Sequence, residues 1–141
     1  KKVELNQLLQ ESDIVTLHVM PAPDNEGLIG ADELAKMKQD AYFVNTSRSW
    51  CTDEDALFKV LNEKKIAGAA FDVFDKEPLP FDHPFLSLDN VILLPHIGGN
   101  TVEVENHQTD ILVPDLERLI NGEKPENIMN PEVLSTFKLK T

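Results

Sequence analysis

The chain has 141 residues, and 25 acidic against 13 basic side chains give it a formal charge of −12. This length suits a single domain, and a hydrophobic content of 41% is typical of a globular protein rather than a disordered or fibrous one. The excess of acids disfavours general nucleic-acid binding, and no apolar stretch approaches the roughly 20 residues of a membrane span.

The first half of the chain alternates between helical and extended patterns. Leucines at positions 5, 8 and 9 have the spacing of one helix face, and a β-rich run ends before Pro21. Thr52 is the predicted N-cap of a helix that two lysines close. The expected elements are a helix from residue 5, a strand at 14–19, a helix at 32–38, a strand at 41–45 and a helix from 52 to 65.

Two more apolar runs, at residues 66–74 and 91–94, predict the third and fourth strands, and three prolines predict a loop at 75–90. Helices that alternate with short apolar strands indicate an α/β fold with a mostly parallel sheet. Right-handed crossovers are expected to place helices over both faces of this sheet.

A final helix is expected after the fourth strand. Asn100 and Glu103 have the spacing of a capping box, which predicts the start of this helix. Pro114 should kink or split the helix, and Gly122 can end it.

Polar or glycine-bearing residues follow each of the four predicted strands. They are His18, residues 46–48, Asp72 and residues 96–99. Because ligands bind at the carboxyl ends of the strands in an open parallel sheet, these four segments predict one binding site.

Arg48, Glu77 and His96 are the residues in this region whose chemistry forms an interpretable set. A guanidinium can hold a carboxylate through two parallel hydrogen bonds, and an imidazole can exchange a proton near neutral pH. A carboxylate beside the imidazole would orient it and favour its protonated form. The set suits reduction of a 2-oxo acid: Arg48 holds the acid and polarises the ketone, His96 protonates the oxygen, and a cofactor supplies the hydride.

Four ordered motifs resemble the D-isomer-specific 2-hydroxyacid dehydrogenases, and the resemblance extends from about residue 5 to residue 130. The motifs lie at residues 45–48, 68–74, 77–79 and 95–99. The resemblance implies the second half of a Rossmann-like, doubly wound parallel sheet followed by a C-terminal helix. It also implies an NAD-dependent or NADP-dependent enzyme, similar to phosphoglycerate dehydrogenases and to hydroxypyruvate or glyoxylate reductases.

The same resemblance implies a role for each matching residue. Arg48 would bind the substrate, His96 would be the acid/base, and Glu77 would be the partner of His96. Asp72 would contact the nicotinamide carboxamide. The residues expected to line the cofactor are Val19, Thr46, Ser47, Arg48, Asp72, His96, Gly98 and Gly99.

The chain departs from the family pattern in three ways. Ser49 follows Arg48 where the family usually has glycine, and Met20 stands where the family has proline. The six glycines form no Gly-x-Gly-x-x-Gly pattern, so the phosphate-binding half is absent from this sequence. We therefore expect a fragment, with a partial NAD(P)-binding domain at residues 1–130 and a C-terminal tail at residues 131–141.

Several other interpretations remain beside this one. Cys51 could be a nucleophile near a helix start, although a buried structural thiol is favoured, and a single cysteine fits a reducing compartment such as the cytoplasm. His18 is ambiguous, and His83 and His107 are expected to be structural or exposed. No metal site is expected from the histidine spacing.

The alternative function is a non-catalytic half-domain that self-associates through its open sheet, and the intact enzyme is also expected to be a homo-oligomer.

Overall fold

The computed structural model describes residues 1–136, which form two compact units. The first comprises Lys1–Gly98 and the second begins at Gly99, and each is described by itself. The predicted tail at 131–141 lies partly outside the described residues, and the predicted domain boundary after residue 130 stays a prediction.

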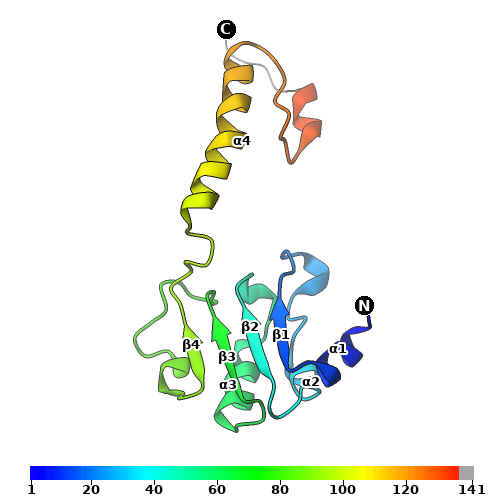
Figure 1. Ribbon diagram of the computed structural model, residues 1–141, viewed down its shortest axis with the longest axis vertical. Coiled ribbons are helices and arrows are strands. Elements are labelled where there is room, and N and C mark those ends of the chain that lie inside the picture. The colour runs from blue at the N-terminus through cyan, green and yellow to red at the C-terminus, as the bar shows by residue number, and fades with distance from the viewer. Residues whose placement is uncertain (137–141) are drawn as a thin grey trace. The chain divides into compact units, whose positions relative to one another are not determined.

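The first unit is built on one four-stranded parallel sheet, as expected for an α/β protein. Its strands are β1 (Ile14–Leu17), β2 (Tyr42–Asn45), β3 (Gly68–Phe71) and β4 (Val91–Leu93). They lie side by side in chain order (Figure 1). The register pairs Leu17 with Asn45, Asn45 with Phe71, and Phe71 with Leu93. The carboxyl ends of all four strands are therefore level at one edge of the sheet.

Helices α1 (Leu5–Glu11), α2 (Ala31–Leu34) and α3 (Glu54–Asn62) cover one face of the sheet. The expectation of helices over both faces is wrong for this unit. Successive right-handed crossovers that always move in the same direction place every helix on the same side, and the order β1-β2-β3-β4 contains no reversal. On the other face Ile14, Tyr42 and Ile92 are more than half exposed.

The core lies between the sheet and these three helices. Leu9 of α1 and Leu34 of α2 pack against the inward residues of the strands. So do the buried residues of α3, which are Ala56, Leu57, Val60 and Leu61. Its largest fully buried side chains are Phe43, Phe85, Leu9, Ile29, Leu34, Leu57, Leu61 and Ile66, together with Asn45 and Cys51. Burial of this apolar surface is the main stabilising contribution and holds the carboxyl edge of the sheet in place.

Two predicted helix caps are wrong by one residue. The N-cap of α3 is Asp53, whose carboxylate accepts from Ala56 N–H at 2.9 Å. The Thr52 hydroxyl instead donates to Ser49 O at 2.8 Å, in the turn before the helix. The last helix, α4 (Val102–Ile120), is capped by Thr101 rather than Asn100, since the Thr101 hydroxyl accepts from Val104 N–H.

In the second unit, α4 continues through Pro114, so the predicted split does not occur. Pro114 is exposed, which lets water solvate the carbonyl group that loses its helical partner. Gly122 follows the helix with a φ of +76°, as its predicted role in ending the helix requires. Asp115 is buried on α4 and accepts from Glu126 N–H and Asn127 N–H at 2.7 and 2.8 Å, which fastens the following segment to the helix.

Four 3₁₀ turns complete the described structure, and one of them falls inside the predicted loop at 75–90. They are η1 (Pro23–Asn25), η2 (Ser49–Cys51), η3 (Pro84–Ser87) and η4 (Pro131–Ser135). Within residues 1–136, no helix combines the length and the apolar character that crossing a membrane demands.

Candidate active site

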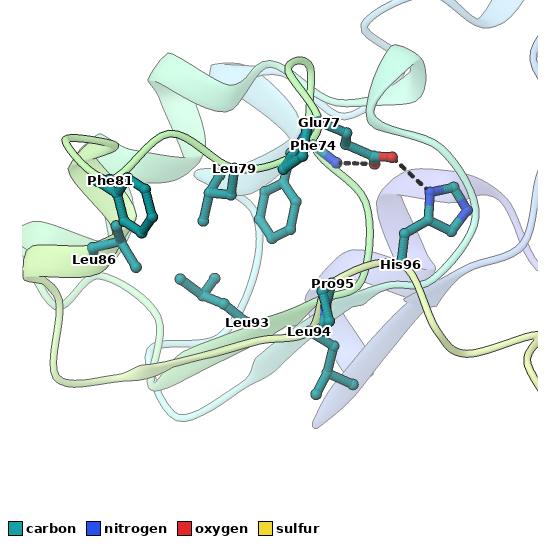
Figure 2. A pocket seen from close by; sticks show the side chains of 10 residues that line it. Phe74, Glu77, Leu79, Phe81, Leu86, Leu93, Leu94, Pro95 and His96 are labelled. Atoms are coloured by element: carbon teal, nitrogen blue, oxygen red, sulfur yellow. Dashed lines mark hydrogen bonds and ion pairs between the residues drawn. The ribbon is translucent and has the colours of Figure 1, made fainter.

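Glu77 and His96 meet at the carboxyl edge of the sheet, although 19 positions separate them in the chain. The Nδ1 atom of His96 lies 2.8 Å from Glu77 Oε2, and the other Glu77 oxygen accepts from Phe74 N–H at 3.0 Å (Figure 2). The imidazole is 43% exposed, so Nε2 remains available to a ligand. A carboxylate on Nδ1 fixes the orientation of the ring.

The pKa of Glu77 is lowered from its ordinary value. The hydrogen bond with His96 is the main cause, and the bond from Phe74 N–H and the positive charge of Arg48 act in the same direction. Glu77 is therefore a carboxylate at neutral pH. The charge of Arg48 makes the smallest of these contributions, and its grouping with Glu77 and His96 stays a prediction.

Arg48 is presented by the loop that follows β2, and the buried Asn45 holds this loop. The Asn45 amide donates to Arg48 O at 2.9 Å, while its oxygen accepts from Ser47 N–H at 2.9 Å. The Arg48 guanidinium donates to Ser47 O. Sequence reasoning gave Asn45 no separate role, although a polar side chain that ends an apolar strand needs hydrogen-bond partners when it is buried.

The substitution of glycine by Ser49 leaves this loop in an ordinary conformation. Ser49 begins η2, and the non-glycine residues with positive φ among the described residues are Lys64 and His96. A side chain at position 49 therefore requires no left-handed backbone after Arg48.

Asp72 holds the turn that contains His96. Its carboxylate is 2% exposed and accepts from Ile97 N–H at 2.8 Å and from Gly98 N–H at 2.6 Å. A Cβ on Gly98 would lie 2.8 Å from the Asp72 carboxylate, so this close approach requires glycine. The predicted contact of Asp72 with nicotinamide stays a prediction, because the structure directs both oxygens at the backbone.

Three of the other predicted cofactor residues, Val19, Thr46 and Ser47, lie just after β1 and β2. The Ser47 hydroxyl donates to Val19 O at 2.5 Å, which joins the two segments, and Thr46 beside it is exposed. Gly98 is exposed after β4, whereas Gly99 begins the second unit. Contact of these residues with a cofactor stays a prediction.

The donor set at this edge fits the nicotinamide end of a dinucleotide. Exposed hydroxyl, guanidinium and imidazole groups at Thr46, Arg48 and His96 can contact an amide, a ribose or a small acid. The Ile97 and Gly98 N–H groups already donate to Asp72, so they offer no cradle to a pyrophosphate.

Glu77 and His96 also line one end of an apolar pocket of about 750 Å³. The other lining side chains are Phe74, residues of the 75–90 loop such as Phe81 and Leu86, and residues 93–95 at and after the end of β4. Figure 2 shows the imidazole turned away from these apolar side chains. The sequence gave no signal for this pocket.

Cys51 is a structural thiol, as favoured from the sequence. It is fully buried in the core, and burial raises the pKa of its thiol, which opposes formation of a nucleophilic thiolate. His18 is exposed and its Nε2 lies 2.9 Å from Thr16 Oγ1, while His83 caps η3 by accepting from Phe85 N–H.

Asp72→Asn should destabilise the chain by about 2 kcal/mol. Asparagine retains one oxygen for a backbone N–H, but its amide group opposes the second N–H, and a hydrogen bond to a charged group contributes about 1.5–3 kcal/mol. Urea unfolding followed by circular dichroism measures the loss. The exposed Asp82→Asn is the matched control, and a change below about 0.5 kcal/mol for Asp72→Asn would contradict the prediction.

Comparison with known proteins identifies relatives of this chain. Residues 1–98 match the family model described as D-isomer specific 2-hydroxyacid dehydrogenase, NAD binding domain. The chain is 42% identical over 137 residues to a glyoxylate reductase of Thermofilum pendens, covering 97% of this chain and 40% of the relative. It is 41% identical over 136 residues to a D-3-phosphoglycerate dehydrogenase of Methanocaldococcus jannaschii, covering 96% and 26% of the two chains.

The fold is shared with a solved enzyme. The D-isomer specific 2-hydroxyacid dehydrogenase of Lactobacillus delbrueckii ssp. bulgaricus, in its NAD-complexed form, superposes with a TM-score of 0.82 at 30% identity. The match covers 91% of this chain and 43% of that enzyme. The chain therefore spans less than half the length of these relatives.

Proposed function

Because the chain belongs to the D-isomer specific 2-hydroxyacid dehydrogenase family, we propose that it forms the second half of the NAD-binding domain in an enzyme that interconverts a D-2-hydroxy acid and a 2-oxo acid. The observation that carries this proposal is the Glu77–His96 pair at the carboxyl edge of the sheet, and Arg48 follows the neighbouring strand β2. Acid/base, orienting carboxylate and carboxylate-binding guanidinium are the side chains that this reaction requires.

The chemistry divides between the cofactor and the protein. Bound NADH supplies the hydride that reduces the carbonyl carbon. Arg48 binds the substrate carboxylate and polarises the neighbouring ketone, and His96 donates a proton to the ketone oxygen. Glu77 orients the imidazole for this transfer, and the exposure of the ring lets solvent return the proton afterwards. In the oxidation direction His96 removes the hydroxyl proton.

The substrate class is a small 2-oxo acid such as glyoxylate or hydroxypyruvate. The relative from Thermofilum pendens is named a glyoxylate reductase, and Arg48 supplies the charge that such a substrate needs. NAD is the proposed cofactor from the family description. NADP remains an alternative, since the phosphate-binding and ribose-binding motifs do not occur in this sequence.

We also propose that the enzyme is a homo-oligomer of the cytoplasm. The free edges of β1 and β4 and the exposed apolar residues on one sheet face support association with further protein. The free thiol of Cys51 is compatible with a reducing compartment. A non-catalytic half-domain that only self-associates is the alternative function, and the same uncovered face favours it.

An NADH-oxidation assay separates these two functions. The enzyme that contains this chain should oxidise NADH with glyoxylate, hydroxypyruvate or pyruvate, whereas the 141-residue chain by itself should show no turnover above background, because it lacks a pyrophosphate cradle. Absorbance at the NADH band measures both rates. Turnover by the chain alone that disappears in Arg48→Ala would contradict the second expectation, and a longer enzyme inactive with all three acids would contradict the proposed function.

A further inference from the structure

Glu54, in the first turn of α3, fastens both ends of the loop that carries Glu77. One Glu54 oxygen accepts from Asp75 N–H at 2.8 Å, and the other lies 3.5 Å from His83 Nε2. Asp75 begins this loop and His83 precedes η3. A single carboxylate on a rigid helix thus anchors two points that stand eight residues apart in the chain.

The His83 ring is fixed in place by contacts with Phe85 and Phe74. Its Nδ1 accepts from Phe85 N–H at 3.3 Å, and its ring packs edge-on against Phe85 and Phe74 with centroid distances of 5.0 and 6.2 Å. An Nδ1 that accepts leaves the ring proton on Nε2, which then faces Glu54. The ring therefore joins α3 to the loop through one defined tautomer.

The two contacts of Glu54 lead directly to Glu77. Phe74 N–H donates to Glu77, and the next backbone group, Asp75 N–H, donates to Glu54. These consecutive groups fix the same short stretch of backbone to two carboxylates. Loss of the Glu54 contact would free the peptide beside the one that holds Glu77.

We propose that Glu54 and His83 are positioning residues that hold Glu77 against His96. The inference rests on the proposed function for its consequence in catalysis, because Glu77 acts there through His96. Neither Glu54 nor His83 lines the pocket. They act on the reaction only through the place of the Glu77 carboxylate.

The surroundings of Glu54 show why this pair is sensitive to substitution. Both side chains are 16% exposed. Burial raises the pKa of Glu54, the nearby charge of Asp75 adds to this rise, and Asp75 N–H and His83 oppose it. A partly buried carboxylate needs hydrogen-bond partners, which Asp75 N–H and His83 provide for Glu54. Replacement of Glu54 by a neutral side chain therefore alters both contacts.

Glu54→Gln and His83→Asn separate positioning from local stability. In Glu54→Gln the amide oxygen can still accept from Asp75 N–H, but the amide NH₂ opposes the Nε2 proton of His83. In His83→Asn the shorter side chain can still cap η3 by accepting from Phe85 N–H but no longer reaches Glu54. Asp55→Asn removes an exposed charge from the same helix turn. Val60→Ala weakens the buried face of α3 and leaves the loop contacts in place.

The direct readout is the titration of the Glu77 carboxyl group in this chain, followed by ¹³C NMR and assigned through Glu77→Gln. Glu54→Gln and His83→Asn should each raise the pKa of Glu77 towards the ordinary glutamate value, because its bonds from His96 and Phe74 N–H loosen. Asp55→Asn and Val60→Ala should leave this titration unchanged. A variant that only destabilises the fold would lower the unfolding midpoint without moving the Glu77 titration.

In the active enzyme, the same two substitutions should lower kcat by up to about 100-fold, since a displacement of about 1 Å has effects of this size. The KM for NADH should stay within a few-fold. An unchanged Glu77 titration in His83→Asn would overturn the inference that these residues position Glu77. If Glu54→Gln does not fold, His83→Asn alone tests this inference. The proposed function fails separately, when the enzyme is inactive although the Glu77 titration responds.

Discussion

His96→Asn should lower kcat of the enzyme by about 10²- to 10⁴-fold, the usual contribution of a general acid or base. His96 has a φ of +56°, and asparagine is one of the few residues that adopt this left-handed conformation readily. The turn held by Asp72 should therefore remain intact. The substitution removes the proton donor and leaves the backbone that surrounds it.

Steady-state kinetics and a fluorescence titration with NADH measure this result. The dissociation constant for NADH should change by only a few-fold, because the imidazole is assigned to the substrate oxygen. His107→Asn, on the exposed surface of α4, is the matched control and should keep the activity of the unmodified enzyme. A His96→Asn enzyme with unaltered kcat would remove His96 from the acid/base role.

Arg48→Ala should lower kcat/KM for a 2-oxo acid by about 10²- to 10⁴-fold. Two charge-assisted hydrogen bonds to the substrate carboxylate are lost, and each contributes about 1.5–3 kcal/mol. Arg48→Lys should recover only part of this loss, because an ammonium group cannot form two parallel bonds to one carboxylate. Asn45 holds the backbone carbonyl of residue 48, so the loop should keep its conformation in both variants.

A substrate analogue tests whether the loss arises at the carboxylate. The unmodified enzyme should strongly prefer glyoxylate to the corresponding amide, and Arg48→Ala should lose this preference. Arg118→Ala, on α4, serves as the control for removal of a positive charge. An Arg48→Ala enzyme that still discriminates between acid and amide would show that another group binds the carboxylate.

Most of the fold could be predicted because its signals are local. The apolar runs before Pro21, at residues 41–45 and at residues 66–74 became strands, each shorter than or equal to the predicted range. Helix caps were less certain, since Thr52 and Asp53 both have suitable side chains, and the cap is identified only by the bond that Asp53 accepts from Ala56 N–H. Which face of the sheet the helices cover depends on the order of the strands, and no single segment of the sequence encodes that order.

The sequence allowed the catalytic residues of the candidate site to be predicted, but not the residues that hold their loops in place. Arg48, Glu77 and His96 were selected from their chemistry and from the family resemblance. Asn45, which holds the Arg48 loop, and Glu54, which holds the Glu77 loop, were not selected. Their functions depend on backbone groups at other positions, and the spacing of residues along the chain does not reveal such contacts.

By itself, the sequence determined the α/β class, the order of its elements, the family and the residue types available for hydride-transfer chemistry. These properties follow from apolar periodicity and from motifs that each consist of a few consecutive residues. Only the tertiary structure decided that the helices of the first unit share one face, that Asp72 binds the His96 turn, and that α3 anchors the Glu77 loop. Each of these depends on packing between distant segments, because a directed hydrogen bond needs its two partners within about 3 Å of each other.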